Sequence, residues 1–274
     1  MKKFGIVCIL CCLFMLPVRS QSVGLVLSGG GAKGFAHVGA LRALEEAGIL
    51  PDIISGVSAG SLVGALYADG HSPDEILDMF DGLAVHDLAE LVLPRTGFMK
   101  IDRFRAFLKR NLRAQNIEDL QIPFCVTATD LDHGRSVTFT SGPIIERVCA
   151  SCSMAIVMSP VLIDGIHYVD GGVMRNFPVK PIRNICNTVI GVNVSPMVTD
   201  NYKQSIIDIA FRSYYLQSKG NTFEDLGLCD VLIQTEEAIK YNVFDLEHTQ
   251  AIAEVGYRAT KEALDAQRKT LKEN

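Results

Sequence analysis

Two glycine-rich segments, each set between a short apolar run and a helical pattern, constrain the fold of this chain most. The first follows the apolar residues 23–27 and reads Gly29-Gly-Gly-Ala-Lys-Gly34. The second begins at the last residue of the run 51–56 and reads Gly56-Val-Ser-Ala-Gly60. A short apolar run that ends in glycine is typical of a buried strand, and the apolar positions after each segment recur at helical spacing. From residue 23 onward, the sequence therefore predicts two successive strand–turn–helix units.

Strands and helices are expected to alternate along the rest of the chain. We expect strands at 124–129, 136–139, 189–194 and 231–234, a hairpin around Asp164-Gly165, and helices starting at Ser72, over 102–112, around 205–219 and from about 245 to the end. A length of 274 residues fits one large or two small domains. The alternation predicts one α/β domain over 21–274, a three-layer αβα arrangement with a largely parallel central sheet.

The first twenty residues have the pattern of a secretory signal peptide. Lys2 and Lys3 precede an uncharged apolar run at 4–16, and Pro17 to Ser20 leads to a small residue suited to cleavage. The run is shorter than the ~20 apolar residues that a membrane span needs. We expect cleavage near Ser20 and an exported protein, either periplasmic, outer-membrane-associated or secreted. The alternative is an anchor formed by a retained N-terminal segment.

Charge and cysteine content exclude other classes of function. Lys and Arg number 26 against 31 Asp and Glu, and no basic block occurs, so a nucleic-acid partner is not expected. Cys149 and Cys152 form a close pair, but the sequence lacks the second ligand pair of a zinc site, so no metal site is expected. Most cysteines after residue 20 are interpreted as small buried hydrophobic residues.

The second glycine segment contains a candidate nucleophile. Gly56 and Gly60 flank Ser58 in a G-x-S-x-G pattern between a predicted strand and a predicted helix. Small neighbours allow the chain to reverse sharply, and the positive end of the helix dipole favours negative charge on the serine oxygen. The alternative is a glycine-rich helix start packed under the sheet, in which Ser58 is an ordinary N-cap. The motif alone leaves both open.

The first glycine segment also has two interpretations. Gly29, Gly31 and Gly34 match the dinucleotide fingerprint G-x-G-x-x-G, and Asp52 lies near the expected position of a ribose-binding acid. Asp52 precedes the second strand, however, whereas the ribose acid belongs at the far end of that strand. The other interpretation is an oxyanion hole formed by the backbone N–H groups of Gly29, Gly30 and Gly31. A nearby G-x-S-x-G favours the oxyanion hole, because acyl transfer needs both parts.

A nucleophilic serine also needs a base. None of the six histidines follows a late strand with an acidic partner upstream, although His248 comes nearest. Asp170-Gly171-Gly172 directly follows a predicted strand, and its two glycines permit a tight loop that brings the carboxylate against a partner. As an isolated pattern, this segment is more often only a turn.

Together and in this order, the three motifs resemble those of the patatin-like phospholipases, a family of serine lipid acyl hydrolases, and the similarity extends from about residue 23 to 265. The resemblance implies a Ser58–Asp170 dyad, in which Asp170 takes the serine proton and later activates water. It also implies that the amides of Gly29, Gly30 and Gly31 stabilise the oxyanion, with Lys33, Gly34, Gly56, Gly60, Gly171 and Gly172 supporting the motifs. No metal and no organic cofactor are expected.

The sequence departs from the family pattern in two segments, at residue 33 and at residues 155–156. Lys33 stands where the family usually has Arg, which keeps the charge but loses the planar fork of the guanidinium group. Ala155 and Ile156 stand where family members commonly carry Pro and Gly. Neither departure removes a dyad residue.

The sequence thus predicts an exported esterase that acts on a lipid or acyl-ester substrate at a membrane surface through an acyl-Ser58 intermediate. Whether it is a phospholipase, a lysophospholipase or a simple esterase is left open. The alternatives are a dinucleotide-binding oxidoreductase and a catalytically silent lipid-binding domain. Residues 84–99 are apolar and poor in charge, which fits a lipid-facing lid, although an ordinary packed helix is the simpler interpretation.

Overall fold

The computed structural model describes residues 22–91, 99–197 and 206–273. The expected signal peptide lies outside these residues. Among the described helices, none combines the length and the apolar character that crossing a membrane requires.

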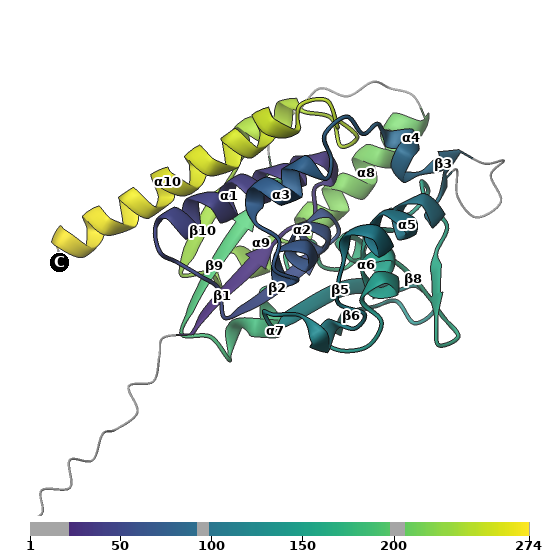
Figure 1. The fold of residues 1–274 in the computed structure, drawn as a ribbon, viewed down its shortest axis with the longest axis horizontal. Helices are drawn as coiled ribbons and strands as arrows, with labels where there is room; N and C mark the ends of the chain where they lie inside the picture. Colours follow the sequence, from purple (N-terminus) through teal and green to yellow (C-terminus); the bar gives the residue numbers. More distant parts are fainter. Residues whose placement is uncertain (1–21, 92–98, 198–205, 274) are drawn as a thin grey trace, which may run out of the picture.

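An eight-stranded mixed sheet forms the centre of the molecule, in the order β10-β9-β1-β2-β5-β8-β7, with β6 also paired to β5 (Figure 1). Neighbouring strands from β10 to β5 are parallel, whereas β6, β7 and β8 run antiparallel to their partners. A separate two-stranded sheet pairs β3 with β4. The strands are β1 (Val23–Leu27), β2 (Ile53–Val57), β3 (Glu90–Leu91), β4 (Met99–Lys100), β5 (Phe124–Asp130), β6 (Arg135–Phe139), β7 (Val161–Ile163), β8 (Ile166–Asp170), β9 (Thr188–Asn193) and β10 (Val231–Gln234).

Helices connect these strands and cover both faces of the sheet. The long helix α10 lies along α1 on one side of the sheet (Figure 1). The helices are α1 (Phe35–Glu46), α2 (Ala59–Ala68), α3 (Pro73–Asp78), α4 (Val85–Leu88), α5 (Asp102–Asn111), α6 (Ile144–Cys152), α7 (Lys180–Arg183), α8 (Ile206–Gly220), α9 (Phe223–Leu226) and α10 (Thr249–Glu273).

The alternation of side chains along β1 shows why the molecule has three layers. Leu25 and Leu27 belong to the larger apolar core, which α1, α2 and α10 also build, whereas Val26 belongs to a second core with Phe177 and Ile182. Successive side chains of a strand point to opposite faces, so each face of β1 carries its own core. This confirms the expected α/β fold with a largely parallel sheet flanked by helices.

Local sequence signals are also confirmed. Ser72 and Glu75 form a reciprocal capping box at the start of α3. Asp164 and Gly165, at the tip of the β7–β8 hairpin, both have positive φ. The described cysteines are free, and Cys125, Cys149 and Cys186 are buried. Helix α6 was not predicted, although its apolar residues recur at helical spacing, and neither were the short helices α7 and α9.

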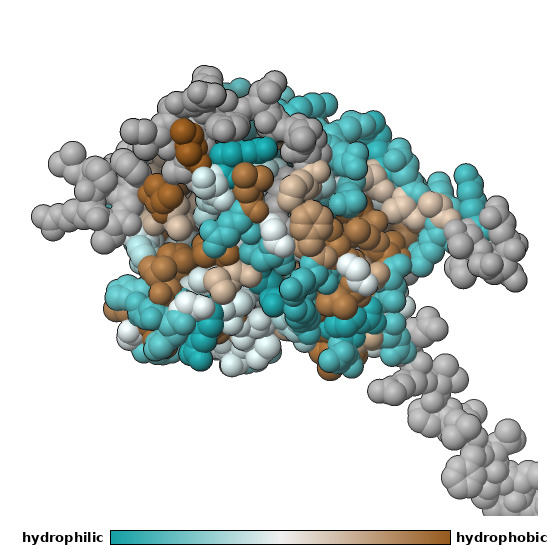
Figure 2. Space-filling model, turned by 180° about the vertical axis from the view of Figure 1, so that it is seen from behind, coloured by the Kyte–Doolittle hydropathy of each residue, from teal (hydrophilic) through white to brown (hydrophobic). Residues whose placement is uncertain are grey.

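Figure 2 shows the face opposite to that of Figure 1. Apolar side chains gather there in separate patches among hydrophilic ones. Exposed large apolar residues on and near α8 include Ile209, Leu216 and Phe223. An apolar surface of this kind is common on globular proteins and is not by itself a binding site.

Candidate active site

The register of β5 brings two strand ends together. β6 pairs with Val126–Asp130 along one edge of β5, so β2 and β8 must share the other edge. They approach from opposite directions, and their last residues, Val57 and Asp170, pair with the successive residues Thr127 and Ala128. The sheet therefore places Ser58, which follows Val57, beside Asp170.

Ser58 occupies a sharp turn between β2 and α2. Its backbone has φ 53° and ψ −125°, in a region that non-glycine residues rarely adopt. A Cβ atom at Gly56 would lie 2.5 Å from the carbonyl oxygen of Gly60, and one at Gly60 would lie 2.3 Å from that of Leu27. The Ser58 side chain makes no capping hydrogen bond to α2. The serine therefore has the geometry of a nucleophile elbow rather than that of an ordinary N-cap.

The Ser58 hydroxyl contacts the carboxylate of Asp170. Ser58 Oγ donates to Asp170 Oδ2 at 2.5 Å, and the backbone N–H of Gly172 donates to Oδ1 at 2.7 Å. Asp170 is 2% exposed, and burial raises its pKa to about 6 against the lowering effects of Ser58, Gly172 and the Tyr214 hydroxyl. A carboxyl group that changes charge near neutral pH is suited to act as a general base.

Two side chains of α6 bind the backbone of Ser58 and hold the turn in place. Ser151 Oγ accepts the Ser58 N–H at 2.8 Å and donates to the Thr127 carbonyl at 2.7 Å, so it ties the elbow to β5. Cys152 Sγ donates to the Ser58 carbonyl at 3.2 Å. Burial raises the pKa of Cys152 well above its usual value, so it stays a neutral thiol. The sequence carried no signal for either contact.

The first glycine segment lies directly against Ser58. A Cβ atom at Gly29 would lie 3.2 Å from Ser58 Cβ and 2.3 Å from Asn176 Oδ1. The Gly29 N–H donates to the Asn176 carbonyl at 3.1 Å, so it is already engaged. The N–H groups of Gly30 and Gly31 donate to no acceptor among the described residues. Of the three expected oxyanion donors, the structure leaves these two available.

The glycine segment is anchored by buried neighbours. His37 Nε2 donates to the Ser28 carbonyl at 2.8 Å, and burial lowers the pKa of His37 to about 4, so it is a neutral structural residue. A Cβ atom at Gly34 would lie 2.5 Å from Ala59 Cβ, which shows how closely the two motifs pack. Lys33 is 5% exposed, and its Nζ lies 5.2 Å from the centre of the Tyr215 ring.

Asp52 and His248, the candidate ribose-binding acid and the nearest candidate histidine base, do not contact Ser58. Asp52 Oδ2 accepts the N–H of Val23 at 2.7 Å, at the amino ends of β1 and β2, whereas the glycine segment follows the carboxyl end of β1. Asp52 therefore cannot bind a ribose held by that segment. His248 is exposed and bonds to Asp245 at 2.8 Å.

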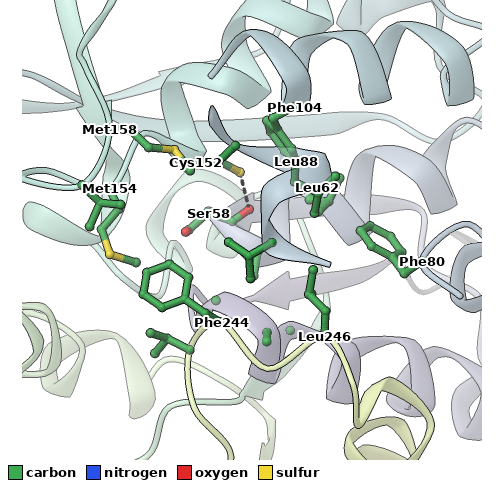
Figure 3. Close-up of a pocket in the computed structure, with 18 of the residues that line it drawn as sticks. Ser58, Leu62, Phe80, Leu88, Phe104, Cys152, Met154, Met158, Phe244 and Leu246 are labelled. Atoms are coloured by element: carbon green, nitrogen blue, oxygen red, sulfur yellow. Dashed lines mark hydrogen bonds between the residues drawn. The ribbon is translucent and has the colours of Figure 1, made fainter. Parts of the chain in front are cut away.

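A cavity of about 150 Å³ opens at Ser58 (Figure 3). Its side-chain walls are apolar except at Ser58 and Cys152. They come from α1, α2, the segment after α3, α4, β4, α5, residues 152–158 and residues 243–246. The larger ones are Phe35, Leu62, Val63, Phe80, Val85, Leu88, Met99, Phe104, Met154, Val157, Met158, Val243, Phe244 and Leu246.

The segment 84–99 contributes to this cavity as far as it is described. Val85, Leu88, Ala89 and Met99 line the cavity wall. Residues 92–98 lie outside the described part of the chain. The described part therefore forms a wall beside Ser58, and its action as a lid stays a prediction.

The fold and the site together define the class of the protein. It is a serine-hydrolase-like α/β protein, with a serine elbow, a buried carboxylate beside the serine and an apolar cavity. The sequence model of the family described as "Patatin-like phospholipase" matches residues 25–182, more than half of the chain. The chain belongs to this family.

The chain is similar to named members of the family. It is 35% identical over 195 residues to the patatin-like phospholipase domain-containing protein ZK370.4 of Caenorhabditis elegans, covering 67% of this chain and 14% of that protein. It is 28% identical over 243 residues to lysophospholipase nte1 of Emericella nidulans, covering 85% and 16%. The match thus spans only about one seventh to one sixth of the length of these relatives.

A solved structure shares the fold. VipD from Legionella pneumophila has a TM-score of 0.54 and 14% identity, with 90% of this chain and 67% of that chain covered. At this identity the similarity shows the fold alone.

Proposed function

We propose that the protein is a serine acyl hydrolase of lipid esters that acts through Ser58 and Asp170. The observation that carries this proposal is the 2.5 Å hydrogen bond from Ser58 Oγ to a buried carboxylate at the wall of an apolar cavity. A dinucleotide-binding oxidoreductase would need none of these features.

Acylation begins when Asp170 Oδ2 takes the Ser58 proton while Oγ bonds to the ester carbonyl carbon. The carbonyl oxygen becomes an oxyanion. The bond to the leaving alcohol then breaks, and Asp170 returns the proton to the alcohol oxygen. In deacylation a water molecule takes the place of the alcohol, gives a proton to Asp170 and attacks the acyl carbon. The bond between the acyl carbon and Ser58 Oγ then breaks, and Asp170 returns the proton to Ser58 Oγ.

The oxyanion is stabilised by the N–H groups of Gly30 and Gly31. Gly30 precedes the short helical turn Gly31–Gly34, and Gly31 begins it. The first N–H groups of a helical turn have no carbonyl partner within that turn, so these two are free to bind an oxyanion. A donor that meets the oxygen only in the transition state is commonly worth about 10²-fold in rate or more. The mechanism requires no metal and no organic cofactor.

The cavity indicates the substrate class. Its walls offer aliphatic, aromatic and thioether groups and no charged side chain, which suits one acyl chain of a lipid ester. One of the named relatives is a lysophospholipase, which supports a phospholipid or lysophospholipid substrate. Such lipids are presented at a membrane surface, and we propose that the protein acts there.

Active-site labelling tests the proposal. The protein is treated with a fluorophosphonate, and its intact mass is compared with that of Ser58→Ala treated in parallel. A single adduct that is absent from Ser58→Ala, together with loss of ester hydrolysis in Ser58→Ala and Asp170→Asn, supports the dyad. A folded wild-type protein that binds lipid but gives neither adduct nor turnover indicates the silent lipid-binding domain instead.

Export is proposed separately from the chemistry. The pattern of residues 1–20 supports cleavage near Ser20 and a location beyond the inner membrane or outside the cell. Mass spectrometry of the N-terminus after expression in a secreting host tests this. A mature protein beginning near Gln21 supports export, and an intact Met1 in a membrane fraction indicates a retained anchor.

A further inference from the structure

One face of α8 packs on the loop that carries Asp170. Gln217 Nε2 donates to the Val173 carbonyl at 3.5 Å, and Asn221, just beyond the helix, donates from Nδ2 to Gly172 and Val173 at 3.3 and 3.1 Å. Tyr214 lies one turn before Gln217, on the same face, because residues spaced by three and seven align on a helix. Its hydroxyl interacts with the Asp170 carboxylate.

Four groups face the Asp170 carboxylate. They are the Ser58 hydroxyl from the elbow, the Gly172 N–H, the Cys152 thiol from α6 and the Tyr214 hydroxyl from α8. Burial and the nearby carboxylate raise the pKa of Tyr214 well above its usual value, as burial does for Cys152. Tyr214 is therefore a protonated donor over the whole working range of pH.

The proposed reaction removes one of these donors midway. In the free enzyme the Ser58 hydroxyl has the larger effect on Asp170, and Tyr214 the smaller. Once Ser58 Oγ carries the acyl group, it has no proton to donate. Asp170 must still be ionised and correctly placed to accept a proton from water. Because the Cys152 thiol donates to the Ser58 carbonyl rather than to Asp170, only the Gly172 N–H and the Tyr214 hydroxyl then remain to bind the carboxylate.

We propose that Tyr214 is a positioning residue, whose hydroxyl holds the Asp170 carboxylate ionised and oriented while Ser58 is acylated. This inference rests on the proposed function and adds a third side chain to the dyad. It assigns α8 a role in deacylation, since Tyr214 of this helix interacts with Asp170, and Gln217 and the following Asn221 contact the loop after Asp170.

The pH dependence of Tyr214→Phe tests the inference. The substitution removes a hydrogen-bond donor from the ionised Asp170 carboxylate, which favours the protonated acid. The acid limb of the kcat–pH profile should therefore shift to higher pH by roughly half to one unit. A chromogenic ester should also give a larger pre-steady-state burst, because deacylation slows more than acylation. Tyr67→Phe is the matched control, since it also removes a buried hydroxyl that donates to a carboxylate, Glu45, at 2.9 Å. It should lose stability without a shift of the limb.

A direct titration gives a readout independent of turnover. The ¹³C carboxyl signal of Asp170 is followed against pH in wild type, Tyr214→Phe, Ser58→Ala and the double variant. Ser58→Ala reproduces the missing serine donor, so Tyr214→Phe should raise the pKa of Asp170 further in that background than in wild type. Equal pKa values with and without the Tyr214 hydroxyl in Ser58→Ala would overturn the inference. The dyad itself fails only if Ser58→Ala still hydrolyses esters, so the two failures are distinguishable.

Discussion

Val57 and Asp170 end two strands that meet head to head along one edge of β5, where they pair with neighbouring residues. The geometry of the proposed Ser58–Asp170 dyad therefore depends on how closely the loop after Asp170 approaches β5. Gly171 sets that approach. A Cβ atom there would lie 2.4 Å from the Thr127 carbonyl oxygen and 2.7 Å from Val57 Cγ2.

Gly171→Ala should therefore separate Asp170 from Ser58. A displacement of about 1 Å commonly costs on the order of 10²-fold in rate, and we expect a loss of this size in kcat/KM. Esterase kinetics on the folded variant measure it. Gly227→Ala is the control, because Gly227 has nothing within 4 Å of an added Cβ and an ordinary φ of −70°. Wild-type activity in Gly171→Ala would refute the packing argument.

The pKa of Asp170 predicts the pH dependence of hydrolysis. Burial raises this pKa to about 6, and Asp170, as the proposed base, must be ionised to accept the serine proton. Activity should accordingly rise with pH and reach half its plateau near pH 6. A kcat/KM profile on an uncharged ester measures the midpoint for the free enzyme. A midpoint near 4 would mean that the carboxylate is better solvated than its burial indicates.

The raised pKa of Asp170 also predicts that the buried, ionised carboxylate destabilises the folded state. The folded pKa lies above the unfolded value of 3.8, so the folded state binds the proton more tightly, and stability falls as pH rises from about 4 to 6. Asp170→Asn mimics the neutral acid. It should be more stable than wild type at pH 7.5, by about 1–3 kcal/mol, with little difference near pH 4.

Urea unfolding at both pH values measures this difference. Asp81→Asn, at an exposed position, is the control and should leave stability nearly unchanged at either pH. A less stable Asp170→Asn at pH 7.5 would show that the carboxylate contributes more through its hydrogen bonds than it loses through burial.

Local patterns in the sequence predicted the parts of the site that depend on neighbours in the chain. The elbow at Ser58 follows from Gly56 and Gly60, whose missing side chains the turn requires. The α3 cap and the Asp164-Gly165 turn are local in the same sense.

Contacts between distant segments could not be predicted in this way. Ser151 reaches the Ser58 N–H across 93 positions, and the Asn176 carbonyl engages the Gly29 N–H that the sequence analysis expected to be an oxyanion donor. Tyr214 belongs to the same group, because nothing in its local pattern places α8 on the Asp170 loop. These relations arise only once β2 and β8 share an edge of β5.

The apolar cavity predicts a dependence on acyl-chain length. Each buried methylene contributes about 0.8 kcal/mol, which is roughly fourfold in kcat/KM, until the chain fills the space. Met158 and Phe244 both line the cavity. Met158→Trp should shift the preference to shorter esters, and Phe244→Ala should shift it to longer ones.

A series of esters differing by single methylenes measures the preference. Phe223→Ala is the control, because Phe223 is 59% exposed and does not line the cavity. Opposite shifts for the two cavity variants support acyl binding there. Identical chain-length profiles in all variants would place the acyl chain elsewhere.

Ile156 is strained, and relieving the strain should stabilise the protein. Its φ is +76°, a left-handed conformation that is costly for a β-branched residue, and its side chain is 49% exposed. Such strain costs of order 1–3 kcal/mol, part of which the greater freedom of glycine in the unfolded chain offsets, so Ile156→Gly should gain about 1 kcal/mol. Asp164→Gly, at φ +50°, should gain less, because Asp tolerates this conformation. Thermal unfolding of both variants compares the gains, and a destabilised Ile156→Gly would show that contacts of the isoleucine outweigh its strain.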